Sequence, residues 1–162
     1  MKGLKFGNSG GGGISPTNRY IFKDGELFVG MNAYAWKPSG YSSYVVNGTL
    51  SITNNLLQLS QNSGNYGNTS FITTAIDVTN VNSIKFTVDS DNNYVNYFYA
   101  GMTDNVKADY NPIGMITVLG PRAGTTWAVD TSSLTGNKYF VFLIRSENSY
   151  QNIVNIREIE LL

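Results

Sequence analysis

Histidine and cysteine are both absent from this sequence of 162 residues. The first absence removes the commonest general base, the second removes the best thiol nucleophile, and together they remove the usual ligands of zinc sites. Two carboxylates alone can hydrolyse a glycosidic bond, but Asp and Glu here fall mostly at expected turns or on polar strand faces. We therefore expect no catalytic residues and no enzymatic activity.

An excess of charge of either sign is also missing. Lys and Arg number 11, Asp and Glu number 11, and the basic residues form no block. Because nucleic-acid binding needs clustered Lys and Arg, we expect no nucleic acid among the partners. No apolar run approaches the roughly 20 residues that span a bilayer, and the segment after Met1 lacks the apolar core of a signal peptide. We expect no membrane segment, and release by cell lysis rather than secretion.

Uncharged polar residues dominate what is present. Asn, Ser and Thr account for 49 residues, whereas charged residues make up only 14% of the chain. Helical domains rely on Ala, Leu, Glu and Lys, while many polar turns and hydroxyl-bearing strand faces are typical of β-proteins. The length suits one domain that can bury a sizeable core without disulfides.

Two dipeptides predict hairpin turns, Asp24-Gly25 and Asn47-Gly48. Two-residue turns between antiparallel strands favour these residue pairs, because both central positions need a positive φ. The flanking runs that we expect to pair are 19–22 with 26–29, and 43–46 with 49–53.

Three later runs are apolar on both faces, as is typical of central strands; they are 94–102, 113–119 and 138–145. The run 83–89 instead alternates, which predicts a strand with one polar face.

The last run, 153–162, changes phase. Val154 and Ile156 share one face, whereas Ile159 and Leu161 fall on the other. A bulge near Arg157-Glu158 would return all four side chains to the core.

About ten short strands at such spacings, without a helical pattern, predict a sandwich or jelly roll. We expect an all-β fold, an antiparallel β-sandwich or jelly roll over residues 18–162, preceded by an extended Gly-rich N-terminal arm over residues 1–17.

The arm cannot form a core of its own. Gly10 to Gly13 are four consecutive glycines, and the apolar residues of the segment are Leu4, Phe6 and Ile14. Such a segment is either a disordered tail or an arm docked on a partner. We favour the docked arm, with these three side chains as its partner-anchoring residues.

Aromatic residues are the candidates for ligand binding. Tyr34, Trp36 and Tyr41 crowd a stretch rich in Gly, Pro and Ser, and Trp127 opens a later strand. Sugar-binding sandwiches use such rings as flat apolar surfaces beside polar hydrogen-bonding groups. The alternatives are that the tryptophans pack in the core and the tyrosines anchor loops, or that the rings contact another protein.

The segment Asp89-Ser90-Asp91-Asn92-Asn93 concentrates oxygen ligands that suit Ca²⁺. Asp89 and Asp91 are thus candidate calcium ligands. The alternative is a polar turn in which Asp and Asn bond their own backbone. We expect no other metal or cofactor.

Two pairs of segments resemble those of carbohydrate-binding-module-like jelly rolls. They are Thr74–Val78 leading to Ile84–Phe86, and Val129–Gly136 leading to Lys138–Phe142. The Gly-rich leader followed by Tyr20–Glu26 is similar to the opening of small tail, baseplate and capsid-accessory proteins of phages. Together these resemblances imply a virion protein with a sugar-binding-like fold, and such folds also serve purely as protein-contact modules.

Two functional hypotheses follow. The first is a non-enzymatic virion structural or accessory protein, a capsid decoration or tail component on the phage particle surface. It would be attached through residues 1–17 to other virion proteins, with its own copies as further partners. The second is a carbohydrate-binding module that recognises a host cell-surface glycan.

Overall fold

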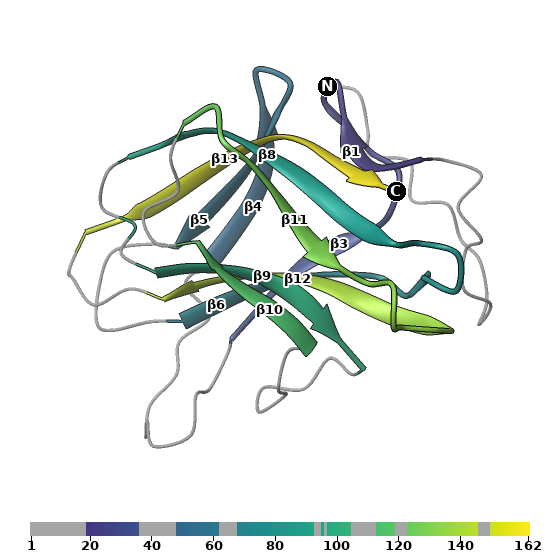
Figure 1. Cartoon of the computed structure of the whole chain (residues 1–162). Coiled ribbons are helices and arrows are strands. Elements are labelled where there is room, and N and C mark those ends of the chain that lie inside the picture. The colour runs from purple at the N-terminus through teal and green to yellow at the C-terminus, as the bar shows by residue number, and fades with distance from the viewer. Residues whose placement is uncertain are drawn as a thin grey trace.

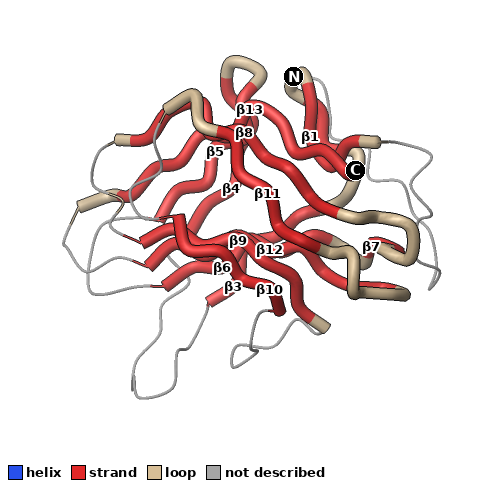
Figure 2. Tube along the Cα trace, viewed as in Figure 1, coloured by secondary structure: helices blue, strands red, loops and turns tan. Residues whose placement is uncertain are grey.

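The computed structural model describes residues 19–35, 48–61, 68–92, 95, 97–104, 113–118, 123–145 and 150–162. The predicted anchors Leu4, Phe6 and Ile14 lie outside these residues, as do Trp36 and Tyr41. The regular structure of these residues is entirely β, as Figure 2 shows, so the expected all-β class is confirmed. Within the described ranges, no helix has the length and apolar character to cross a membrane.

The first sheet is built around the C-terminal strand β13. Its path runs through β11 (Thr126–Asp130), β8 (Ser83–Asp91), β13 (Asn152–Leu161), β1 (Tyr20–Lys23) and β2 (Glu26–Leu27). The N-terminal half of β13 also pairs with β5 (Leu56–Gln61), which pairs in turn with β4 (Gly48–Thr53). The pairings in this seven-stranded sheet are antiparallel.

The second sheet is built around β12. Its path runs through β10 (Ile113–Val118), β9 (Tyr97–Thr103), β12 (Asn137–Arg145), β6 (Asn68–Thr73) and β3 (Met31–Ala35). The short strand β7 (Ile76–Asp77) pairs with the start of β12. The two sheets lie face to face (Figure 1), which confirms the antiparallel sandwich.

Phenylalanine rings fill the space between the sheets. Phe86 of β8 lies edge-on to Phe142 of β12, with ring centroids 5.0 Å apart and planes at 84°. Phe98 of β9 and Phe140 of β12 complete the group, at 6.2 Å and 6.4 Å from the Phe86 centroid. All four are fully buried. Edge-to-face contacts of this kind add to the stability gained from burial, so this group joins the two sheets.

The first hairpin prediction is confirmed. The second is wrong at Gly48, which lacks the positive φ that the predicted turn needs, while residues 43–47 of that predicted hairpin lie outside the described residues. Asp24 and Gly25 both have positive φ, at 51° and 81°, between the paired strands β1 and β2. Gly48, however, lies in β4, where it pairs with Gln61. Glycine is needed there because a Cβ atom at this position would collide with the Thr69 side chain.

The turn that follows β4 uses two asparagines instead. Asn54 and Asn55 have φ of 53° and 61°, and they join β4 to β5. Asn tolerates this left-handed region better than most residues, because its short polar side chain can bond locally. Asn-Asn is a less obvious turn signal than Asn-Gly, which is why the sequence pattern pointed to the wrong dipeptide.

The bulge predicted in the last strand is confirmed. The register between β13 and β8 shifts between Asn155 and Glu158. As a result Val154, Ile156, Ile159 and Leu161 are all buried.

The prediction of central strands was partly wrong. β12 is central, between β9 and β6, whereas β10 is at the edge of its sheet. An apolar run on both faces therefore does not by itself distinguish a central strand from an edge strand.

Candidate functional site

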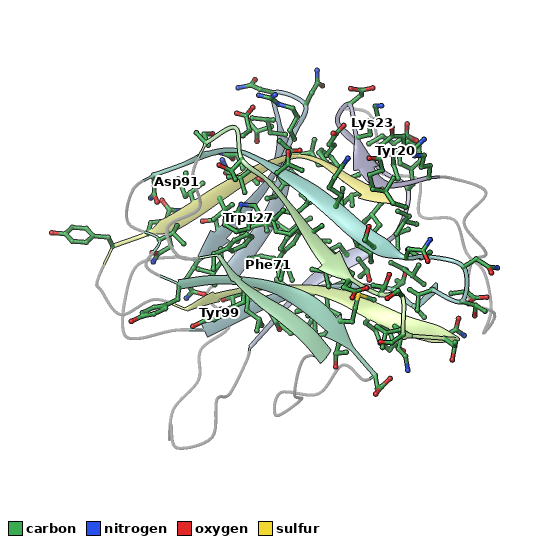
Figure 3. All side chains as sticks on the ribbon, in the orientation of Figure 1. Tyr20, Lys23, Phe71, Asp91, Tyr99 and Trp127 are labelled. Atoms are coloured by element: carbon green, nitrogen blue, oxygen red, sulfur yellow. The ribbon has the colours of Figure 1, made fainter. Side chains whose placement is uncertain are left out.

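Strand alternation divides the side chains of β9 between two environments. Phe98, Ala100 and Met102 belong to the main core between the sheets. Tyr97 and Tyr99 alternate with them and therefore point to the outer face of the six-stranded sheet. In Figure 3 Phe71 lies between the sheets, whereas Tyr99 lies on the outside of its sheet.

The outer face of this sheet carries a second, smaller apolar cluster. It consists of Ile72 of β6 with Val141 and Leu143 of β12, all essentially inaccessible to solvent. Tyr99 and Tyr139 are partly buried and pack against this cluster. The aliphatic side chains thus support the Tyr99 and Tyr139 rings from beneath, and each ring keeps part of its surface accessible.

Tyr34 reaches the same face from the edge strand β3. Met31 and Ala33 pack toward the main core, so the alternate residue Tyr34 points outward, with 38% of its surface exposed. Tyr34 pairs with Ser70, Ser70 with Leu143, and Leu143 with Tyr99. These residues form one row across four strands, so Tyr34 and Tyr99 are about 14 Å apart at roughly 4.8 Å per strand. We name Tyr34, Tyr97, Tyr99 and Tyr139 the tyrosine face.

The orientation of two of these rings is well defined. The planes of Tyr97 and Tyr99 are within 5° of parallel, and their centroids are 6.4 Å apart. Next to Tyr34, Asn32 is exposed on the same face, whereas the Ser70 hydroxyl is buried and donates to the Tyr34 carbonyl oxygen at 3.4 Å. Apolar ring faces with hydroxyl and amide groups nearby are suited to stacking on, and hydrogen bonding with, a sugar.

Trp127 belongs to a different part of the molecule. Its strand β11 pairs with β8 so that Trp127 is opposite Phe86, and its indole packs against the main core. Figure 3 shows Trp127 between the two sheets. The structure therefore separates Trp127 from Tyr34, its fellow candidate for glycan binding, and supports the alternative of core packing for this residue.

The two candidate calcium ligands have separate environments. The Asp89 carboxylate accepts hydrogen bonds from Arg157 Nε at 3.0 Å and from Nη2 at 2.5 Å. Asp91 ends β8, opposite Val154. The described part of the chain contains no group of three or more His, Cys, Asp or Glu side chains arranged to hold a metal. Arg157 already compensates the charge of Asp89. Calcium binding by Asp89 and Asp91 therefore stays a prediction from the sequence.

Three members of the tyrosine face were missed as site residues by sequence reasoning. Tyr97, Tyr99 and Tyr139 lie in runs that are apolar on both faces, and such runs were interpreted as central strands. The available signal was the residue type on the outward positions. Tyr alternates there with Phe, and its hydroxyl favours an accessible position over a fully buried one.

Comparison with known proteins supports the fold. No protein-family model matches the sequence, and no curated protein matches it. A solved carbohydrate-binding module of family 29 superposes with a TM-score of 0.55 and 15% sequence identity, covering 88% of this chain and 86% of that chain. A family 29 variant complexed with cellulohexaose, described as probing ligand recognition, gives a TM-score of 0.54 and 16% identity, with 88% of each chain covered. At these identities the likeness establishes the β-sandwich fold.

Proposed function

We propose that this chain is a non-enzymatic carbohydrate-binding domain that holds a glycan against the tyrosine face. The observation that carries the proposal is the placement of four tyrosines from three strands on the outer face of one sheet, where Tyr99 and Tyr139 pack on a buried aliphatic layer. Rings supported in this way lose little conformational entropy when a ligand binds, because each has only two side-chain torsions.

The chemistry of the face favours a sugar over an ordinary core or a protein contact. A pyranose ring presents a patch of C–H groups that stacks on an aromatic face, and its hydroxyls need polar partners at the rim. Tyr34 and Tyr99 supply two separated rings, so a chain of several sugars can contact both. The family 29 modules, which are carbohydrate-binding modules by description, share the sandwich.

The virion role predicted from sequence depends on residues 1–17, which lie outside the described residues. The structural neighbours support glycan binding rather than that role. Deleting residues 1–17 still tests it: a folded domain that no longer joins a particle would support attachment through Leu4, Phe6 and Ile14, and undiminished incorporation would refute it.

A glycan array tests the proposed function directly. The wild-type chain should bind at least one polysaccharide, and Tyr99→Ala or Tyr34→Ala should each weaken that binding about tenfold, the effect of losing one stacked ring with its buried area. Tyr20→Ala is the matched control, because Tyr20 lies in β1 of the other sheet and contacts Lys23. Circular dichroism checks that each variant is folded.

Two results would contradict the proposal. One is an array on which the folded wild-type chain binds no glycan. The other is binding that survives both Tyr99→Ala and Tyr34→Ala unchanged, since the tyrosine face would then not be the contact surface.

A further inference from the structure

Tyr150, just before β13, is the most exposed of the large hydrophobic side chains that the structure describes. Its exposed fraction is 56%, compared with 38% for Tyr34. A single exposed aromatic residue is ordinary on a protein surface. What sets this one apart is the backbone that carries it.

Three amide side chains hold that backbone in place. Asn152 Nδ2 donates to the Tyr150 carbonyl oxygen at 3.1 Å, and Asn92 Nδ2 donates to the Gln151 carbonyl oxygen at 2.6 Å. The Ile153 amide donates to Asn92 Oδ1 at 3.1 Å. Gln151 Nε2 in turn donates to the Ser60 hydroxyl at 2.9 Å.

These contacts come from three strands or strand ends: β5, the end of β8 and the start of β13. A side chain whose backbone is fixed by neighbouring groups is prepared for binding, because less freedom is lost on contact with a ligand. The segment therefore presents the Tyr150 ring on a rigid support.

The segment that carries Tyr150 lies at the end of the sandwich where the tyrosine face begins. Arg145 is the cross-strand partner of Tyr97, and Tyr150 follows Arg145 by five residues, a span of at most about 18 Å. Asn92 bonds the Tyr150 segment and precedes Tyr97 by the same number of residues. Figure 3 shows Asp91, the neighbour of Asn92, and Tyr99 toward one end of the molecule and Tyr20 toward the other.

We infer that Tyr150 is an outlying sugar-binding subsite, which a glycan on the tyrosine face reaches only when it is several sugars long. The inference rests on the proposed function. A single ring among amides and hydroxyls is suited to one sugar, whereas a stable protein interface needs about 1,000 Å² of buried surface.

Titration calorimetry with cellohexaose and cellobiose tests the inference. If cellulose oligomers do not bind, the hexasaccharide and disaccharide of the polysaccharide that binds best on the array take their place. Tyr150→Ala should weaken hexasaccharide binding about tenfold and leave disaccharide binding within about twofold. Tyr150→Phe, which keeps the ring, should retain most of the affinity, and Tyr20→Ala should change neither ligand.

The outcomes separate this inference from the proposed function. Loss of binding in Tyr99→Ala with no effect of Tyr150→Ala would overturn the subsite alone. An equal loss for both ligand lengths in Tyr150→Ala would overturn its outlying position. A change in sedimentation with unchanged glycan affinity would assign Tyr150 to a protein contact and overturn the subsite. Absence of all glycan binding in the wild type would overturn both proposals.

Discussion

At the scale of single residues, individual side chains restrict the path of the backbone. Gly48 is the clearest case, since the Thr69 side chain occupies the space that any Cβ atom at position 48 would need. The Thr69 hydroxyl is itself bonded to the Gln61 side-chain oxygen, and Thr69 and Gln61 are both fully buried. Thr69 therefore cannot move aside without breaking a buried polar contact, which is costly.

Gly48→Ala should destabilise the fold by about 1–3 kcal/mol, the usual cost of forcing extra volume into a packed site. Urea unfolding measures the change. Thr69→Ala alone loses the contact with Gln61, but in the Gly48→Ala/Thr69→Ala double variant the two closest contacts, those with Thr69 Cγ2 and Oγ1, are removed and the collision is relieved. The double variant should therefore be more stable than the sum of the single effects, and simple additivity would show that the collision is absent.

Asn54 tests the left-handed turn. Its φ of 53° is unfavourable for a residue with an ordinary side chain, so Asn54→Ala should destabilise the domain by about 1 kcal/mol. Asn54→Gly should be neutral within about 0.5 kcal/mol, because glycine adopts this region freely. The two variants are compared by thermal unfolding. Equal stability of both would mean that the turn does not need a positive φ.

At the scale of elements, two aspartates each stabilise a turn, and the segments that contain these two turns contact each other. The Asp77 carboxylate accepts a hydrogen bond from the Thr79 amide at 3.0 Å, and Asp130 does the same for the Ser132 amide at 2.9 Å. The Thr131 hydroxyl then donates to the Val81 carbonyl oxygen at 2.6 Å. Turn chemistry of this kind occurs in both segments that resemble carbohydrate-binding-module-like jelly rolls.

These hydrogen bonds predict an acid-sensitive contribution to stability. Bonds from the Thr79 side chain and amide lower the pKa of Asp77, and bonds from Ser132 lower the pKa of Asp130. Because each folded pKa is below the unfolded value of about 3.9, the stabilisation is present above about pH 4. It is lost as the pH falls through the lowered folded value.

The double variant Asp77→Asn/Asp130→Asn isolates this effect, because Asn keeps an acceptor oxygen but does not titrate. Urea unfolding between pH 7 and pH 2 should show the wild type losing more stability than the variant below about pH 4. Parallel pH profiles of the two proteins would contradict the assignment.

For the molecule as a whole, stability depends on contacts between two sheets that share no strand. Phe86 supplies the contact from the seven-stranded sheet, against three phenylalanines of the six-stranded sheet. Phe86→Ala should destabilise the fold by about 3–5 kcal/mol. Hydrogen exchange should show reduced protection in β8 and β12 together, because the sheets stabilise each other. Loss confined to β8 would mean that the sheets unfold separately.

Much of this architecture was predictable from local patterns. The Asp24-Gly25 turn, the alternation of β8 and the phase change that announces the bulge in β13 are all properties of a few neighbouring residues. The pairing of β4 with β5 was not predictable in the same way, since Asn54-Asn55 is a weaker turn signal than Asn47-Gly48. The order of the strands in each sheet was also not predictable from local patterns, which is why β10 was expected in the middle of a sheet.

The residues of the candidate site were likewise predictable from the sequence only in part. Tyr34 was identifiable because it lies in a stretch crowded with aromatic residues, while Tyr99 and Tyr139 were hidden in runs that look like core. Alternation determines that Tyr99 and Phe98 point in opposite directions, but it does not determine which direction is the interior.

The sequence by itself determined which residue types alternate along each strand and where most turns form, because these features depend on contacts between near neighbours. Only the tertiary structure decided that Tyr34, Tyr99 and Tyr139 share one face and that Trp127 packs against the core between the sheets. The physical reason is that a sheet face is assembled from strands distant in the chain. Its composition depends on their order and register, which the burial of the whole core selects.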